Sequence, residues 1–311
     1  MDYKRYIKDP GIYKRANKFF YHKTDKLVTD PITMSRLKSI YTPPAWRNIW
    51  FSTSPKCHIQ AHGIDASGKK QYILSDAWIN NSRYEKYNRM KRFMKDIKTF
   101  QKKIKLTNFE NSRELLIKLL FNLLIDLHIR VGNEIYAETN GSYGLTTLRQ
   151  KHLVKNGENY NLVFVGKSNI QHDLSIPSKY NTYLQHFYKK RSLNQPLFFY
   201  SVNGNKKSIN SEELNEYLKN NMGSEYTCKD FRTYSANILF IRSFLKNGNK
   251  PVKNVKRFIL ECIDSTAQQL GHTRSVSRKS YISNNLLDYC TDYFDAARGS
   301  TTEQLESHVV S

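Results

Sequence analysis

The sequence has few acidic residues and lacks the marks of secreted and membrane-spanning proteins. Asp and Glu together number 27 among 311 residues, against 50 Lys and Arg, which gives a formal net charge of +23. The scattered cysteines form no Cys-x-x-Cys pair, which argues against a disulfide framework or a four-thiolate zinc site. They are Cys57, Cys228, Cys262 and Cys290. The chain has no long uncharged apolar run, and its first residues lack the apolar stretch of a secretion signal. We therefore expect no membrane span. The expected location is the bacterial cytoplasm or, for a viral chain, the virion and the host cytoplasm.

The composition indicates folded domains that bind a polyanion. Hydrophobic residues make up 39% and aromatic residues 13% of the chain, so it can build cores and is not a disordered basic tail. The length allows two domains. The positive charge favours nucleic acid as the partner. An acidic membrane surface is the competing interpretation, but no basic amphipathic anchor stands out, and we expect no membrane contact.

The first eighty or so residues predict a small β-rich domain, because short β-prone runs alternate with turn signals. The expected strands are 49–51, 59–61 and 70–74. From residue 84 to 105 the apolar residues recur at helical spacing among many Lys and Arg, which predicts an amphipathic helix with a basic, phosphate-tracking face. We place the domain boundary near Ser82, which divides the chain into 1–82 and 83–311.

The second domain is expected to be mostly helical with a short β-sheet. Asn111 and Glu114 resemble a capping box at the start of a leucine-rich helix that Arg130 closes. A short sheet is predicted from strands 162–165 and 170–176, with a tight turn between them. Further helices are expected at 211–221, 228–246 and 253–270, the last ended by Gly271, then in a short helix that carries Tyr281, with a frayed end after Arg298. The fold class is thus α+β.

Two apparent ligand motifs are rejected on their spacing. Gly166-Lys167-Ser168 resembles the end of a phosphate-binding P-loop, but position 161 is Asn and a strand follows, so nucleotide binding is not expected there. Cys57, His58 and His62 are weak candidates for zinc. No carboxylate cluster suits magnesium either, so we expect neither metal nor cofactor.

A constellation of separated residues suits phosphodiester chemistry without a metal. It comprises Arg130, Lys167, Arg232, His272 and Tyr281. Each residue taken alone is more often structural. Together, two Arg and one His can surround the non-bridging oxygens of a phosphodiester while a Tyr attacks phosphorus. A Lys on a hairpin tip can reach the minor groove and protonate the departing 5′ oxygen.

The motifs around these residues, in this order, resemble the small type IB DNA topoisomerases of poxviruses, bacteria and giant DNA viruses. The matching segments are 130–133 with 144–148, 165–167, 229–234, 270–273 and 280–281, and the run from Pro43 to Tyr72 is similar to the bacterial branch. The resemblance implies a β-rich DNA-clamping domain and a helical catalytic domain, a fold core shared with tyrosine recombinases. It also implies relaxation of supercoiled DNA without ATP or metal, through a 3′-phosphotyrosyl intermediate, strand rotation and religation.

The resemblance also implies a role for each matched residue. Tyr281 would be the nucleophile, Lys167 the general acid, and the other catalytic candidates would hold the scissile phosphate. Further residues match family positions at or near the DNA: Lys229, Asn237, Gln71 and Tyr72. Ser168 and Leu74 depart from the poxvirus pattern, so the cleavage-site preference is not carried over. The implied partner is double-stranded DNA, held by a monomeric clamp.

Two other functions fit part of the pattern. Tyrosine site-specific recombinases share the catalytic constellation, but they usually carry His where this chain has Lys229, and their N-terminal domain tends to be helical. A non-enzymatic DNA-binding protein would explain the charge and the basic helix, but it would leave the ordered constellation as coincidence. Topoisomerase is therefore the favoured interpretation.

Overall fold

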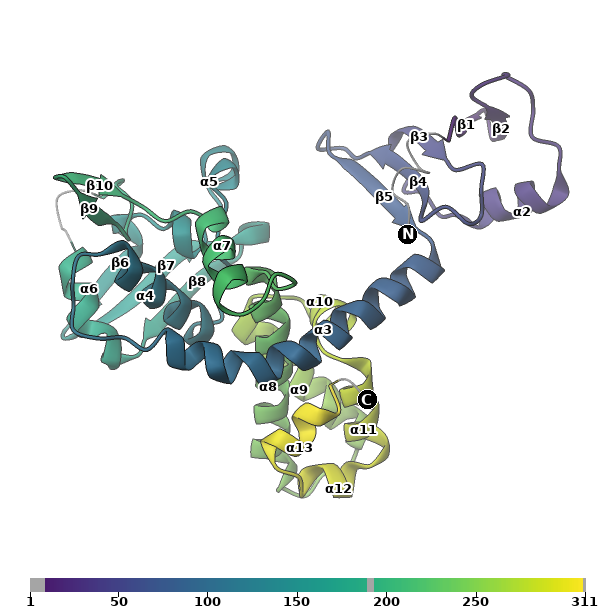
Figure 1. The fold of residues 1–311 in the computed structure, drawn as a ribbon. Coiled ribbons are helices and arrows are strands. Elements are labelled where there is room, and N and C mark those ends of the chain that lie inside the picture. The colour runs from purple at the N-terminus through teal and green to yellow at the C-terminus, as the bar shows by residue number, and fades with distance from the viewer. Residues whose placement is uncertain (1–8, 189–192, 310–311) are drawn as a thin grey trace. The chain divides into compact units, whose positions relative to one another are not determined.

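The computed structural model describes residues 9–188 and 193–309, which divide at residue 86 into two compact units (Figure 1). We call them the N-terminal unit and the C-terminal unit. The division falls inside helix α3 (Asp76–Lys103), as does the boundary predicted near Ser82.

The N-terminal unit is built on one antiparallel five-stranded sheet with the strand order β2-β1-β3-β4-β5. The strands are β1 (Ile12–Arg15), β2 (Lys18–Tyr21), β3 (Arg47–Phe51), β4 (Ile59–Ile64) and β5 (Lys70–Leu74). Helix α2 (Pro31–Ser39) begins at Asp30, whose carboxylate accepts the Thr33 N–H at 2.7 Å. A small core of Ile12, Phe19, Val28, Leu37, Phe51 and Ala61 holds these elements together. The three predicted strands are confirmed, whereas β1, β2 and α2 were not anticipated.

The C-terminal unit begins within α3 and continues into a second helix, α4. The predicted basic helix is confirmed as α3, although it starts eight residues earlier, at Asp76. Its apolar stripe is buried as expected: Met90, Phe93, Met94, Ile97 and Phe100. Helix α4 (Arg113–Asp126) starts one residue after its cap, Ser112, which accepts the Leu115 N–H at 3.1 Å. The capping box predicted at Asn111 is therefore wrong: its side chain instead accepts the Ser201 N–H at 3.1 Å, and Glu114 accepts the Tyr217 hydroxyl.

The sheet of the C-terminal unit is a three-stranded antiparallel meander of β6 (Leu153–Asn156), β7 (Asn159–Val165) and β8 (Gln171–Ile176). The tight turn between β7 and β8 is confirmed as a short 3₁₀ turn, η3 (Lys167–Asn169), in which Ser168 and Asn169 are both left-handed. The elements around this sheet are α5 (Glu134–Asn140), η1 (Leu145–Thr147), η2 (Gln150–His152), η4 (Ser178–Tyr180), α6 (Asn181–Phe187), β9 (Tyr200–Val202), β10 (Asn205–Lys207) and α7 (Ser211–Asn221).

The C-terminal third is a helical bundle around α8 (Cys228–Gly248) and α9 (Val255–Leu270) (Figure 1). The remaining helices are α10 (Arg274–Ser280), α11 (Asn284–Asp292), α12 (Phe294–Arg298) and α13 (Thr302–Ser307). Gly271 caps α9 with φ +58°, as predicted. Tyr281 lies just beyond the end of α10 rather than within it.

The prediction of a frayed end after Arg298 is wrong. Helix α13 follows, and Leu305 and Val309 are fully buried. The Ser283 hydroxyl donates to the Val309 carbonyl at 2.6 Å, which fixes this segment to the bundle. The architecture as a whole confirms the α+β prediction of a small β-rich unit and a larger, mostly helical unit with a short sheet.

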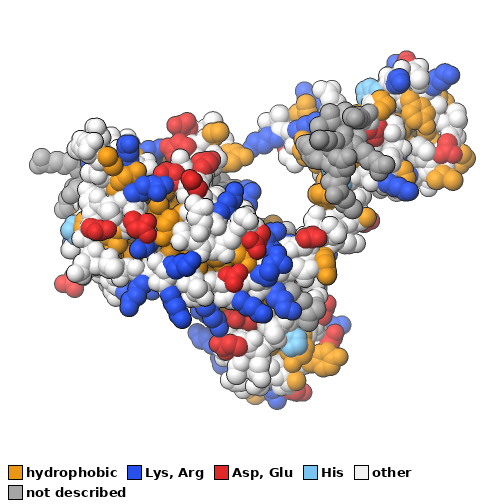
Figure 2. Space-filling view, viewed as in Figure 1, with side chains coloured by type: hydrophobic (Ala, Val, Ile, Leu, Met, Phe, Trp, Pro, Cys, Tyr) orange, Lys and Arg blue, Asp and Glu red, His pale blue; other side chains and the backbone are white. Residues whose placement is uncertain are grey.

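Basic side chains are spread over the visible face of the C-terminal unit (Figure 2). On α3 the exposed ones include Lys91, Lys95, Lys98 and Lys102. Among the helices that the structure describes, none is long and apolar enough to cross a membrane.

Candidate active site

Arg232 is held by main-chain oxygens at the centre of a group of basic residues in the C-terminal unit, which we call the basic cluster. It stands in the second turn of α8 with only 8% of its surface exposed. Its two terminal nitrogens donate to the carbonyls of His128 and Leu270. Its Nε is buried and has no hydrogen-bond partner among the described residues. Burial, reinforced by the charge of Arg130, lowers the pKa of Arg232 to about 9. A buried guanidinium with a free donor is suited to an anionic oxygen.

His272 lies directly against this arginine. The left-handed Gly271 turns the chain at the end of α9, and the His272 N–H donates to the Ala267 carbonyl at 2.8 Å. The His272 Nε2 lies 3.1 Å from a terminal nitrogen of Arg232, and its Nδ1 lies 3.4 Å from the Ser277 hydroxyl. Because a guanidinium can only donate, Nε2 accepts and the proton sits on Nδ1.

Burial and three nearby cations keep the His272 ring neutral. Burial lowers the pKa of His272 to about 3, and the charges of Arg232, Arg130 and Lys167 act in the same direction. The neutral ring stacks on the Tyr281 ring, with centroids 4.5 Å apart and an interplanar angle of 23°. The stack places the phenol among the basic side chains.

Arg130 also contacts the Tyr281 side chain. It lies beyond the end of α4, after the left-handed His128 (φ 51°), and not at the helix end as predicted. Burial lowers the pKa of Arg130, and the charge of Tyr281 and a hydrogen bond with its side chain partly offset that effect. The Arg130 carbonyl accepts the Leu145 N–H at 2.8 Å. A Cβ at Gly144 would lie 2.7 Å from that carbonyl oxygen, so this close approach requires glycine.

Lys167 approaches the same group of residues from the tip of the β7–β8 hairpin. Its side chain is exposed, and its charge reaches His272 strongly enough to lower the pKa of that imidazole. The structure therefore brings all five candidates from the sequence to one place, although they are spread over 152 positions of the chain.

Asn237 lies differently from the DNA contact expected of it. It is fully buried, and its amide nitrogen donates to the carbonyls of Thr233 and Tyr281 at 2.8 and 3.1 Å. Its amide oxygen accepts the Ser283 N–H at 2.9 Å. Asn237 therefore holds the main chain on both sides of Ile282 and has no surface left for DNA.

Sequence reasoning missed two other supports of this segment. The Tyr87 hydroxyl of α3 donates to the Ile282 carbonyl at 2.7 Å, and Ser277 faces the His272 ring. Tyr87 lies 195 residues before its acceptor, so no local pattern connects the two. The Ser277 contact arises because the first turn of α10 brings Ser277, five residues after His272, back to the imidazole.

The remaining candidates lie outside the basic cluster. Lys229 is exposed on the first turn of α8, beside Asp230, which is bonded to Thr227 and Arg89. Gln71 and Tyr72 lie on the edge strand β5 of the N-terminal unit. The Gln71 amide donates to Asp65 at 2.7 Å, and Tyr72 is 48% exposed.

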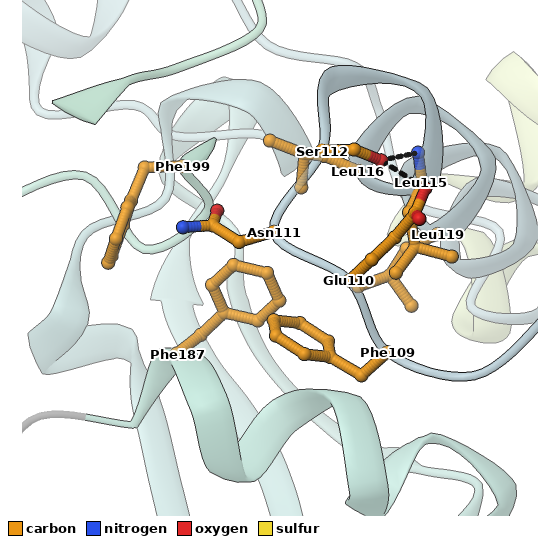
Figure 3. Close-up of a pocket in the computed structure, with 9 residues that line it drawn as sticks. All are labelled: Phe109, Glu110, Asn111, Ser112, Leu115, Leu116, Leu119, Phe187 and Phe199. Atoms are coloured by element: carbon orange, nitrogen blue, oxygen red, sulfur yellow. Dashed lines mark hydrogen bonds between the residues drawn. The ribbon is translucent and has the colours of Figure 1, made fainter. Parts of the chain in front are cut away.

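The described residues show no candidate metal site, and the cavity beside Asn111 is too small for a ligand. Across 9–188 and 193–309, no group of three or more His, Cys, Asp or Glu side chains is placed to hold a metal ion. The pocket in Figure 3, beside Asn111 and Phe187, has a volume of about 10 Å³. That is room for a single water at most, and its lining is mainly apolar.

Comparison with known proteins gives the same family in both units. A family model described as the eukaryotic DNA topoisomerase I catalytic core matches residues 75–305, and one for the bacterial DNA topoisomerase IB N-terminal domain matches residues 18–65. The DNA topoisomerase 1B of Acanthamoeba polyphaga mimivirus is 35% identical over 296 residues, covering 89% of this chain and 87% of that protein. DNA topoisomerase I of Monkeypox virus is 27% identical, and DNA topoisomerase 1B of Vaccinia virus (strain Copenhagen) is 26% identical, each over 80% of this chain and 78% of its own length.

Proposed function

The chain belongs to the type IB DNA topoisomerase family, and from this premise we propose that Tyr281 opens one strand of a DNA duplex and that the residues around it reclose the strand. The family predicted from the sequence motifs is confirmed, and the relatives favour neither a recombinase nor a passive DNA-binding protein. The residue roles below rest on one observation: Tyr281 contacts Arg130 and His272 beside the free Nε of Arg232.

The nucleophile in this proposal is the Tyr281 phenol. A free phenol has a pKa of about 10, so it needs cations to favour the phenolate. Arg130 is hydrogen-bonded to the Tyr281 side chain, and Arg232 contributes a second positive charge. The phenolate attacks the phosphorus, the 3′-phosphotyrosyl bond forms, and the bond to the 5′ oxygen breaks.

The two arginines and His272 hold the phosphate. The free Nε of Arg232 donates to one non-bridging oxygen, and Arg130 to another, so that the developing charge is met by fixed donors. His272, neutral in the free protein, donates to the phosphate after a change of tautomer or by taking up a proton as the anion arrives. Asn237 is a positioning residue, because it holds the main chain of Tyr281 rather than the DNA.

Lys167 is the general acid in this scheme. Its ammonium, on the exposed hairpin tip, gives a proton to the 5′ oxygen as that oxygen leaves. The released 5′ end rotates about the intact strand, and the same hydroxyl then attacks the phosphotyrosine. Because the aryl ester conserves the energy of the broken bond, no ATP is needed for resealing.

Double-stranded DNA is the substrate, and we propose that a monomer clamps it between the two units. The exposed lysines of α3, together with Lys229, contact phosphates, so that affinity falls steeply with salt. Gln71 and Tyr72 approach the bases from β5. The predicted place of action remains the bacterial cytoplasm or, for a viral chain, the virion and the host cytoplasm.

A supercoiled-plasmid assay in EDTA without ATP tests the function. We expect relaxation by the intact chain and none by Tyr281→Phe, which keeps the ring that stacks on His272 but loses the nucleophile. Tyr293→Phe is the matched control, because Tyr293 is 64% exposed and stacks on Tyr289 rather than on His272. Site-specific strand exchange instead of relaxation would identify a recombinase, and neither activity would leave a passive DNA-binding protein.

A further inference from the structure

His172 lies at the base of the hairpin that carries Lys167, and the reaction scheme gives it no role. It is half-buried on β8, directly opposite Phe164 of β7, and the two rings stack with centroids 4.8 Å apart and an interplanar angle of 18°. This stack fixes the orientation of the imidazole relative to the sheet.

The edge of the His172 ring lies between two glycines that precede two active-site residues. A Cβ at Gly166, the residue before Lys167, would lie 2.8 Å from the ring atoms Cδ2 and Nε2. A Cβ at Gly271, the residue before His272, would lie 2.7 Å from Cε1. Real Cβ atoms do not approach that closely, so the ring occupies the space that side chains at both positions would need.

The hairpin tip has few other restraints. Its base is anchored by hydrogen bonds from the Tyr143 N–H to the Val165 carbonyl and from the Gly166 N–H to the Ile170 carbonyl, both at 2.8 Å. Beyond Gly166, however, the turn residues Lys167, Ser168 and Asn169 are all exposed. The position of the Lys167 ammonium therefore depends on how the base of the hairpin packs against the end of α9.

We propose that His172 is a positioning residue, whose ring spaces Gly166 from Gly271 and so sets where Lys167 stands relative to His272. This inference rests on the proposed role of Lys167 as the general acid. Burial and the charges of Arg232 and Arg130 lower the pKa of His172, so the ring is neutral and acts through its shape. Removing the ring lets the hairpin shift against α9, and a shift of about 1 Å in a catalytic group can cost on the order of 100-fold in rate.

The first test compares two leaving groups in His172→Ala. With an ordinary phosphodiester at saturating DNA, we expect strand cleavage to slow by on the order of 100-fold. With a 5′-bridging phosphorothiolate, cleavage should return to within a few-fold of the unmodified chain, because a thiolate leaves without a proton. Equal slowing on both substrates would overturn the proposal, since it would show damage to the active site as a whole.

Lys167→Ala in the same assay separates the inference from the function it rests on. If Lys167→Ala is rescued by sulfur and His172→Ala is not, the positioning role is wrong while the acid assignment stands. If sulfur does not rescue Lys167→Ala, the acid assignment is wrong, and a double-mutant cycle decides whether His172 still spaces the two glycines.

That cycle combines Gly166→Ala with His172→Ala. Gly166 has φ −99°, which alanine adopts without strain, so the cost of Gly166→Ala comes from its contact with the His172 ring. We expect Gly166→Ala to slow cleavage and the double variant to be faster than the product of the two single effects predicts. Gly248→Ala on α8 is the control, because its Cβ would make only an ordinary contact, 3.5 Å from Arg298. Independent, multiplicative effects of the two substitutions would overturn the proposal.

Discussion

Asn237→Ala tests how the protein holds its nucleophile. The substitution removes the partners of the part-buried Tyr281 carbonyl and the buried Ser283 N–H, while the Thr233 carbonyl keeps its place in α8. An unsatisfied buried polar group costs about 1–3 kcal/mol and a part-buried one costs less, so we expect the free energy of unfolding to fall by about 2–4 kcal/mol. Urea unfolding, followed by circular dichroism, measures that loss.

The same variant separates positioning from DNA binding. At saturating DNA, formation of the covalent protein–DNA adduct should slow at least tenfold, because the Tyr281 main chain is released from α8. Affinity for the duplex should stay within about twofold, since Asn237 is fully buried. Asn247→Ala is the matched control: its amide makes the same bond to the carbonyl four residues earlier, at 3.0 Å to Ser243, but no bond to the Tyr281 segment. A normal adduct rate in Asn237→Ala, or an equal loss in Asn247→Ala, would refute this reasoning.

Three further predictions concern other parts of the structure. Arg232→Lys should slow cleavage by about 100-fold or more in single-turnover assays, because one ammonium cannot bond both main-chain carbonyls and present a free Nε. Replacing Gln71 and Tyr72 with Ala should weaken duplex binding in titrations while leaving the adduct rate on saturating DNA within about threefold; unchanged affinity would argue against the clamp. Burial, with the charges of Lys151 and Arg149, lowers the pKa of His152 to about 4. The stability that the neutral His152 ring contributes should therefore be fully present above pH 6.5 and be lost as the pH falls towards 4. His152→Asn, whose amide oxygen can accept the Arg149 N–H, should reduce that loss by about 2 kcal/mol in urea unfolding; an unchanged pH dependence would contradict the assignment.

The parts of the fold that follow from the sequence are those set by local periodicity. The apolar stripe of α3 and the C-cap at Gly271 were predicted because spacing and glycine chemistry fix them locally. The start of α4 was misplaced by one residue, because Asn111 and Ser112 are equally able to cap a helix. The Asn111 side chain accepts the N–H of Ser201 on the distant strand β9, which leaves Ser112 to cap the helix.

Other features depend on tertiary contacts that no local pattern carries. The hairpin of β1 and β2 turns through Ala16 and Asn17, both left-handed, and alanine gives no turn signal of that kind. The burial of α13 depends on a bond from Ser283 to Val309 across 26 positions. For the same reason, the five catalytic candidates could be named from motifs, whereas the supports of the Tyr281 segment by Asn237 and Tyr87 could not.

The residue that becomes covalently linked to DNA is the most direct test of the account. A duplex substrate with a short 3′ end lets the cleaved fragment diffuse away, so the adduct accumulates and its DNA-linked peptide can be sequenced by mass spectrometry. The account predicts a phosphotyrosine at Tyr281 joined to a 3′ end, and no adduct in Tyr281→Phe. An adduct on another residue, a 5′ linkage, or an adduct that persists in Tyr281→Phe would contradict it.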